Sequence, residues 1–229
     1  MLKRIARRIF KLLIWFVVLT VVWVVIYRFV PVPFTPLMAI RAFQAESSYD
    51  IKHDWIALDQ ISEEIQLAVI CAEDQRFLEH SGFDYEAIEK AISYNKTGDK
   101  IRGASTISQQ TAKNVFLWPG RSWLRKGLEA YFTFLIENLW SKERILEVYL
   151  NSIEMGDGIY GVEAAANYWF NTKATHLSRH QAAAIASILP NPRKYKASPR
   201  TPYLEKRKQW VLTQMNNYGD LNLAKNDSH

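Results

Sequence analysis

Length, composition and charge restrict what this chain can be. With 229 residues, 48% of them apolar, it can bury one sizeable core, and we expect a single main domain. The formal net charge is +6, but residues 1–30 contain six basic residues and no acidic one, which leaves 23 basic and 23 acidic side chains in the remainder. The positive excess therefore belongs to the N-terminus, and no nucleic-acid partner is expected.

The first predicted element is a membrane anchor. Residues 12–30 are apolar or aromatic apart from Thr20 and Arg28, and nineteen residues at about 1.5 Å each would span roughly 28 Å, close to the hydrocarbon thickness of a bilayer. A cleaved signal peptide is the alternative. However, this stretch exceeds the roughly 7 to 15 apolar residues of such peptides, and prolines follow it instead of small residues.

Basic residues also predict the orientation of the anchor. Five of them precede the apolar segment, which favours a cytoplasmic N-terminus and places the rest of the chain on the outer side of the cytoplasmic (inner) membrane. Three prolines between residues 31 and 36 then make a stiff exit from the membrane. We divide the chain into four parts: anchor 1–30, membrane-proximal linker 31–48, main domain 49–218 and a disordered tail 219–229.

Helical patterns follow one another through the main domain. Apolar residues recur at helical spacing after Ser62 and after Asp84, and residues 123–150 are rich in helix formers with a break expected at Ser141. Ser178 and Gln181 make a capping box before another apolar run. Because no alternating strand of useful length is present, we predict an all-α fold.

Acidic residues, a histidine and a glycine directly follow the first of these runs. Residues 73–84 read Glu-Asp-Gln-Arg-Phe-Leu-Glu-His-Ser-Gly-Phe-Asp. A carboxylate partly desolvated where a buried helix meets a turn has a raised pKa, which makes a glutamate useful as a base near neutral pH. Taken alone, an acidic helix end is more often a solvated surface.

A second polar stretch, residues 103–114, reads Gly-Ala-Ser-Thr-Ile-Ser-Gln-Gln-Thr-Ala-Lys-Asn. Its first residues are poor helix formers but good caps, so a helix should begin near Ser105 or Thr106. Gln109 and Gln110 precede Lys113 by four and three residues, which places two amides and an ammonium on one face. A helix N-terminus followed by several cations is typical of a diphosphate site, although solvated basic residues are the simpler alternative.

With two later segments, these stretches resemble the peptidoglycan glycosyltransferases. That family forms the polymerising module of bifunctional penicillin-binding proteins and also occurs as monofunctional enzymes. The first stretch matches Glu-Asp-x-x-Phe-x-x-His-x-Gly, and the second matches Gly-x-Ser-Thr-Ile-x-Gln-Gln-x-x-Lys-Asn. Residues 125–129 match Arg-Lys-x-x-Glu, and residues 142–151 match Lys-x-x-Ile-Leu-Glu-x-Tyr-Leu-Asn. A weaker fifth motif is met by Arg207, Val211, Leu212 and Met215.

The resemblance implies a lysozyme-like helical fold with a cleft and a membrane-proximal apolar subdomain that receives lipid. The donor would be a growing glycan on undecaprenyl diphosphate, and the acceptor would be lipid II. By this analogy Glu73 is the general base that takes a proton from the acceptor's sugar hydroxyl. The oxygen then attacks the anomeric carbon, inverts it and expels the lipid diphosphate. Expected partners are these lipid-linked substrates, the cytoplasmic membrane and other cell-wall synthases.

The remaining roles follow from charge and from the motifs. The departing diphosphate would be stabilised by Lys113, Arg121, Arg125 and Lys126, with or without a divalent cation such as Mg²⁺. Glu129 is the second predicted catalytic residue and would position the acceptor or those cations. No organic cofactor is expected, and the sequence does not identify ligands for a metal. The other predicted substrate-binding residues are Gln109, Gln110, Asn114, Ser105 and Thr106.

Four further motif residues are predicted to support the site structurally: Asp74, Phe77, His80 and Gly82. We expect Asp74 to hydrogen-bond its neighbours instead of moving protons. His80 has no His or Cys partner at ligand spacing, so an ordering hydrogen bond is expected in preference to metal binding.

Two other functions fit parts of the sequence. A muramidase or lytic transglycosylase would also use a glutamate in a helical cleft, but cleavage of a neutral glycosidic bond has no diphosphate for the cationic group around Lys113 to stabilise. The second alternative is not an enzyme: it is a non-catalytic membrane scaffold of the cell-wall machinery.

Overall fold

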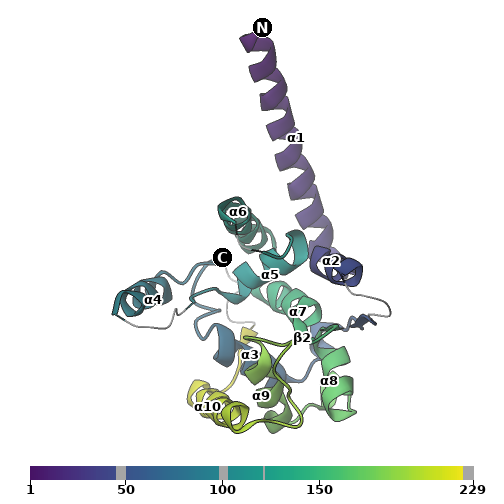
Figure 1. Ribbon diagram of the computed structural model, residues 1–229, viewed down its shortest axis with the longest axis vertical. Helices are drawn as coiled ribbons and strands as arrows, with labels where there is room; N and C mark the ends of the chain where they lie inside the picture. Colours follow the sequence, from purple (N-terminus) through teal and green to yellow (C-terminus); the bar gives the residue numbers. More distant parts are fainter. Residues whose placement is uncertain (45–49, 98–102, 121, 224–229) are drawn as a thin grey trace.

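The computed structural model describes residues 1–44, 50–97, 103–120 and 122–223. One long helix, α1 (Leu2–Phe29), projects from a helical body, with the N-terminus at its far end (Figure 1). This helix is long and apolar enough to cross a membrane. The predicted membrane-spanning segment is therefore a continuous helix, and it begins ahead of the apolar stretch, so that the basic residues lie on its first turns.

Helices that are buried along most of their length form the core of the body. In α3 (Glu63–Glu73) seven consecutive residues from Ile65 to Cys71 are buried, and in α9 (Arg179–Ile188) residues 182–188 are buried. These two helices pack on each other and on α10 (Pro202–Tyr218), at the end of the body farthest from the N-terminus (Figure 1). A helix with no polar face is stable only where other elements cover it.

A second layer lies between this core and α1. Here α5 (Ile107–Phe116) packs against both α6 (Trp123–Leu139) and α7 (Lys142–Ser152). The predicted break is present, because Ser141 caps α7 and accepts a hydrogen bond from the Arg144 amide. The remaining helices are α2 (Pro36–Gln44), α4 (Tyr85–Thr97), α8 (Val162–Phe170) and the short 3₁₀ turns Leu58–Gln60 (η1) and Ala174–His176 (η2).

The all-α class is confirmed, with one small addition. Three strands of two or three residues, β1 (Lys52–His53), β2 (Glu154–Gly156) and β3 (Ile159–Tyr160), form a sheet in the order β1-β3-β2. β1 is parallel to β3, and β2 is antiparallel to it. Strands this short leave no alternating pattern in the sequence, which is why the sequence did not predict them.

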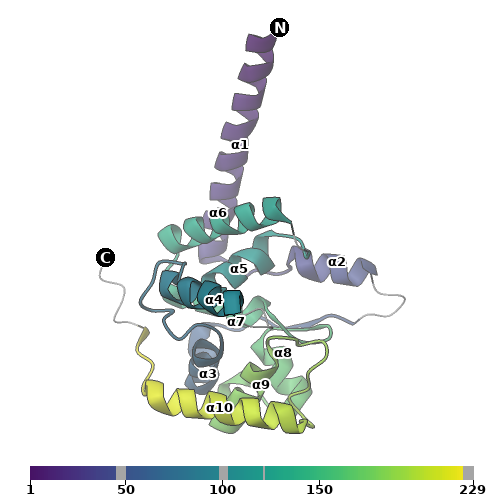
Figure 2. The same ribbon diagram turned by 60° about the vertical axis from the view of Figure 1, so that its left-hand side comes forward.

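The C-terminal part of α1 is attached to the body by hydrogen bonds as well as by apolar packing. The hydroxyls of Thr20 and Tyr131 are 2.8 Å apart, and the Trp140 indole donates to the Val24 carbonyl at 2.9 Å. The guanidinium of Arg144 donates to the Tyr27 carbonyl. Figure 2 shows α6 crossing α1 at this end. The anchor is therefore packed against the body along its last turns, which fixes its direction relative to α6.

Candidate functional site

The predicted base lies at the end of a buried helix. Glu73 is the last residue of α3, and its Oε2 accepts a hydrogen bond of 2.9 Å from Gln110 Nε2 on α5. Gln110 Oε1 in turn accepts from the Tyr149 hydroxyl at 3.3 Å. Burial raises the pKa of Glu73, while the Gln110 hydrogen bond and the charge of Arg207 partly oppose that rise. Such a carboxylate is suited to accept a proton near neutral pH.

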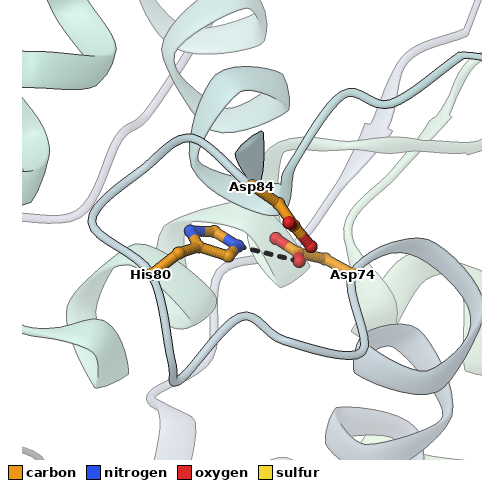
Figure 3. A group of neighbouring side chains, drawn as sticks. All are labelled: Asp74, His80 and Asp84. Atoms are coloured by element: carbon orange, nitrogen blue, oxygen red, sulfur yellow. Dashed lines mark hydrogen bonds and ion pairs between the residues drawn. The ribbon is translucent and has the colours of Figure 1, made fainter. Parts of the chain in front are cut away.

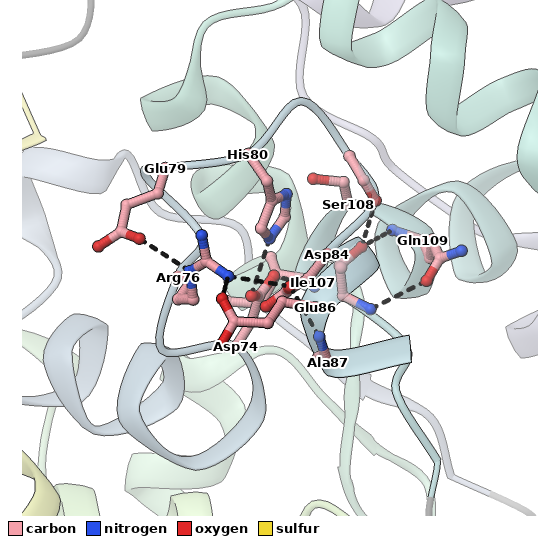
Figure 4. Close-up of polar contacts among 12 residues, drawn as sticks. Asp74, Arg76, Glu79, His80, Asp84, Glu86, Ala87, Ile107, Ser108 and Gln109 are labelled. Carbon is pink, nitrogen blue, oxygen red and sulfur yellow. Dashed lines mark hydrogen bonds and ion pairs between the residues drawn. The ribbon is translucent and has the colours of Figure 1, made fainter. Parts of the chain in front are cut away.

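The adjacent carboxylate has a different environment. Asp74 Oδ1 lies 2.9 Å from His80 Nε2, and Asp74 Oδ2 accepts from the Ile107 amide at 2.9 Å (Figures 3 and 4). Asp74 therefore joins the end of α3 to the first turn of α5, and the hydrogen bond expected of His80 is present. This aspartate holds the two helices that carry Glu73 and Gln110.

Asp84 completes a group of three potential metal ligands with Asp74 and His80, whose ligand atoms lie within 4.8 Å of one another (Figure 3). Their hydrogen bonds explain this arrangement without an ion. Both Asp74 oxygens accept hydrogen bonds, and Asp84 caps α4 by accepting from the Ala87 amide at 2.9 Å. We interpret the group as a junction between loops and helix ends.

The motif glycine is required by space and by backbone conformation. Gly82 has a φ of +86°, and a Cβ at this position would lie 2.8 Å from Thr133 Cγ2 and 2.9 Å from Glu137 Cγ. Its carbonyl accepts from the Thr106 hydroxyl at 2.7 Å. Phe77 is fully buried nearby in the sequence, with the Lys142 ammonium 4.6 Å from its ring centroid. These contacts hold the 74–84 loop against α5, α6 and α7.

Three cations, Lys113, Arg125 and Lys126, lie near one another on α5 and α6. Arg125 and Lys126 both donate to the buried carboxylate of Glu129, with Arg125 Nη1 at 2.8 Å from Oε2. The Lys113 ammonium makes no hydrogen bond or ion pair with any residue in the described ranges. The Lys113 side chain is exposed to solvent, yet partial desolvation by the surrounding protein lowers its pKa, while Glu129 opposes that change.

A cavity of about 340 Å³ lies along α5. Gln110, which binds Glu73, lines it together with Lys113 and Asn114, and it continues toward Arg41 on α2 and Glu154 on β2. A larger cavity of about 630 Å³, between η1, α7 and residues 221–223, contains none of the predicted site residues. The smaller cavity is therefore the better candidate for a substrate site.

Several predicted residues take other positions. Thr106 and Gln109 are buried and form the capping box of α5, in which each side chain binds the other's backbone amide. Ser105 is exposed just before this cap. Arg121 lies outside the described residues.

Other residues at the site were not among the predicted ones. Arg207 is close enough to Glu73 to lower its pKa, and its only signal in the sequence was the weaker fifth motif. Tyr149 orients Gln110, and in the sequence it was only one residue of the motif at 142–151. Arg41 and Glu154 carry no motif signal that would have identified them.

Comparisons with known proteins agree with this geometry. A sequence model of a family described as "Transglycosylase" matches residues 40–216. A protein of Bacteroides thetaiotaomicron is 56% identical over 94% of this chain and 88% of its own length. Proteins of Pseudomonas syringae pv. syringae and Pseudomonas aeruginosa are 52% and 51% identical, over 96% and 94% of this chain and 94% of their own lengths. All three are named biosynthetic peptidoglycan transglycosylase.

Proposed function

The chain belongs to the transglycosylase family and is a peptidoglycan glycosyltransferase, and from this premise we propose that it polymerises lipid II into glycan strands with release of undecaprenyl diphosphate. One contact supports this most directly. Gln110 binds Glu73 and lines the same cavity as Lys113, so one side chain links the proposed base to the proposed phosphate site.

In the proposed reaction Glu73 accepts the proton of the acceptor's sugar hydroxyl. As that oxygen attacks the anomeric carbon of the donor, the bond from this carbon to the diphosphate breaks, and the configuration inverts. Since burial raises its pKa, Glu73 binds a proton more readily than an exposed glutamate would. Its position at the end of a packed helix keeps the carboxylate in place during the reaction.

The leaving diphosphate needs positive charge that is already in position. In our proposal Lys113 binds it directly, because this ammonium has no competing ion pair among the described residues. Glu129 holds Arg125 and Lys126 beside it. Arg121, Asn114 and Ser105 remain proposed contributors, and Thr106 and Gln109 would act by holding the N-terminus of α5.

A divalent cation such as Mg²⁺ is a candidate to share this charge. Both Glu129 oxygens already accept from Arg125 and Lys126, so the carboxylate offers such an ion little free coordination. Phosphate and water oxygens would have to supply most of its ligands, as is common for Mg²⁺. We propose no organic cofactor.

The apolar surface supports a membrane location. Beside α1, the helix α6 exposes Trp123 to 93% and Leu124 to 70%, and Phe43 of α2 is exposed to 91%. Exposed aromatic side chains close to an apolar helix are suited to the interface of a bilayer. We propose that α1 spans the cytoplasmic membrane with its N-terminus in the cytoplasm, and that α2 and α6 rest on the outer leaflet, where a lipid-linked substrate can enter the cleft.

One assay tests this function. Full-length protein is incubated in detergent with labelled lipid II, and the products are separated by size. We expect polymer and released undecaprenyl diphosphate. If folded wild-type protein leaves lipid II unchanged, the proposal is contradicted. If it degrades added glycan strands and makes no polymer, the glycan-cleaving alternative is favoured.

A further inference from the structure

The 340 Å³ cavity extends beyond Lys113 to two charged residues that the proposed chemistry does not use. Arg41 comes from α2, the first helix after the anchor, and Glu154 comes from β2. Only 6% of the Glu154 surface is exposed, and its Oε1 accepts no hydrogen bond. Arg41 Nε is buried and donates none. The two side chains attract each other electrostatically but do not form an ion pair.

Both groups are therefore incompletely satisfied in the protein. A buried polar group without a partner destabilises the protein, and native structures retain few of them. A cavity wall is a place where a ligand can supply the missing partner. The backbone of Gly158 also hydrogen-bonds the Glu154 carboxylate, so the unpartnered Oε1 is the oxygen that remains for such a ligand.

The charges restrict the chemistry of that ligand. A carboxylate accepts hydrogen bonds from hydroxyl or amide groups and repels phosphate, whereas a guanidinium donates to carbonyl or carboxylate oxygens. A neutral ligand with hydroxyls and an acetamido carbonyl satisfies both. Apolar residues complete the wall: Leu37, Ile153, Pro190 and Pro192. Such residues can cover the C–H faces of a sugar ring.

We propose that Arg41 and Glu154 bind an N-acetylated sugar of the lipid-linked glycan, next to the diphosphate at Lys113. Glu154 accepts a hydrogen bond from a ring hydroxyl, and Arg41 donates to the acetamido carbonyl. The inference rests on the proposed function, since that function supplies the glycan. It adds a saccharide-binding part to the cleft, distinct from its phosphate-binding part.

Binding of fragments separates the two parts. The probes are a soluble peptidoglycan tetrasaccharide that carries neither lipid nor phosphate, and inorganic diphosphate, each titrated into full-length protein by calorimetry. We expect Glu154→Ala to weaken tetrasaccharide binding about tenfold and to leave diphosphate binding unchanged. Lys113→Ala should show the reverse. Glu64→Gln, which removes a carboxylate paired with Arg179 outside the cavity, is the matched control and should change neither.

Kinetics with lipid II provide the second readout. Glu154→Gln, which keeps the size of the side chain, should raise KM several-fold with little change in kcat, and it replaces the alanine variant if that variant fails to fold. Suppose that the wild type polymerises lipid II. If wild type and variant then bind the tetrasaccharide equally, or if neither binds it, the sugar site is contradicted and the proposed function is not. If the wild type binds the tetrasaccharide through Glu154 but does not polymerise lipid II, the proposed function fails and the sugar site remains.

Discussion

The two sides of the cleft prepare their charged groups in opposite ways. On the α3 side, the Glu73 carboxylate is desolvated and accepts a hydrogen bond from a neutral donor, Gln110, which only partly offsets the loss of solvation. On the α6 side, the buried charge of Glu129 is shared between Arg125 and Lys126. The first arrangement raises the affinity of a carboxylate for a proton, and the second uses a carboxylate to hold two cations in place.

This difference suits the two glutamates to the different roles proposed for them. A base needs a pKa near the working pH, which desolvation provides. A phosphate site needs fixed positive charge, which a buried ion pair provides if both partners keep their hydrogen bonds. Lys113 shares a feature with each case, because desolvation lowers its pKa, as it raises that of Glu73, and the opposite charge of Glu129 opposes the change. Each prediction below changes one side and leaves the other intact.

The largest effect is expected for Glu73→Gln. Removal of a general base lowers the rate by a factor of about 10²–10⁴, so polymerisation of lipid II should fall about 10³-fold while fragment binding is retained.

The same variant should also change the stability of the protein. Because the pKa of Glu73 is raised on folding, its ionised form destabilises the folded protein at pH values above the pKa of the unfolded state. The glutamine variant should therefore have a higher Tm than the wild type at pH 7, and this gain should disappear below about pH 4.

Glu163→Gln is a matched control for this variant. Glu163 accepts a hydrogen bond from the Ala174 amide, away from the cleft residues described above. It should leave the rate near that of the wild type. A Glu73→Gln protein that polymerises at the normal rate would remove the base from our mechanism, whatever its Tm.

Replacement of Lys113 acts on the other side of the cleft. Loss of one preorganised donor to a developing charge costs about 10²–10³ in rate, and we expect about 10² for Lys113→Ala. Lys113→Arg keeps the charge and should recover much of that loss. The measurement is kcat/KM with lipid II, combined with calorimetric titration of diphosphate. Unchanged turnover and unchanged diphosphate affinity for the alanine variant would exclude Lys113 from the phosphate site.

The pH dependence of the rate should show the titration of both Glu73 and Lys113. Activity requires an ionised Glu73, so it should fall tenfold per pH unit below the raised pKa of this carboxyl. It also requires a protonated Lys113, whose pKa is lowered, so a second limb should appear at alkaline pH. Lys113→Arg should move the alkaline limb to higher pH and leave the acid limb in place. Movement of the acid limb by this variant would show that the two sides are not independent.

Local features of this fold were predictable because they depend on neighbouring residues. Asp84 and Ser141 cap helices as expected, and the Ser178–Gln181 capping box is present. The family was also predicted correctly, because four motifs retain their order along the chain. The short strands were missed, since two or three residues leave no periodic signal and β1 pairs with β3 about a hundred residues away.

The same limit applies to the site. Glu73 and Lys113 were predicted because each belongs to a motif. The sequence predicted a helix start near Ser105 or Thr106, and Thr106 is the N-cap of α5. It could not show that Gln109 completes the capping box instead of facing a ligand, since a capping residue and a ligand-binding residue at a helix N-terminus have the same pattern. Arg41 reaches the cavity only because α2 packs against α5, a contact between segments separated by about seventy residues.

The smallest predicted effect tests the neutral hydrogen bonds on the α3 side. Tyr149 donates to Gln110 Oε1 and so directs the amide nitrogen toward Glu73. In Tyr149→Phe the amide can rotate, and because its hydrogen bond lowers the pKa of Glu73, the acid limb of the pH profile should move to higher pH. The rate at pH 7 should fall only a few-fold, since a hydrogen bond of this kind contributes about 0.5–1.5 kcal/mol. Tyr203→Phe, at an exposed position, is the control. An acid limb that stays in place, with Tm unchanged, would mean that Gln110 keeps its orientation without the tyrosine.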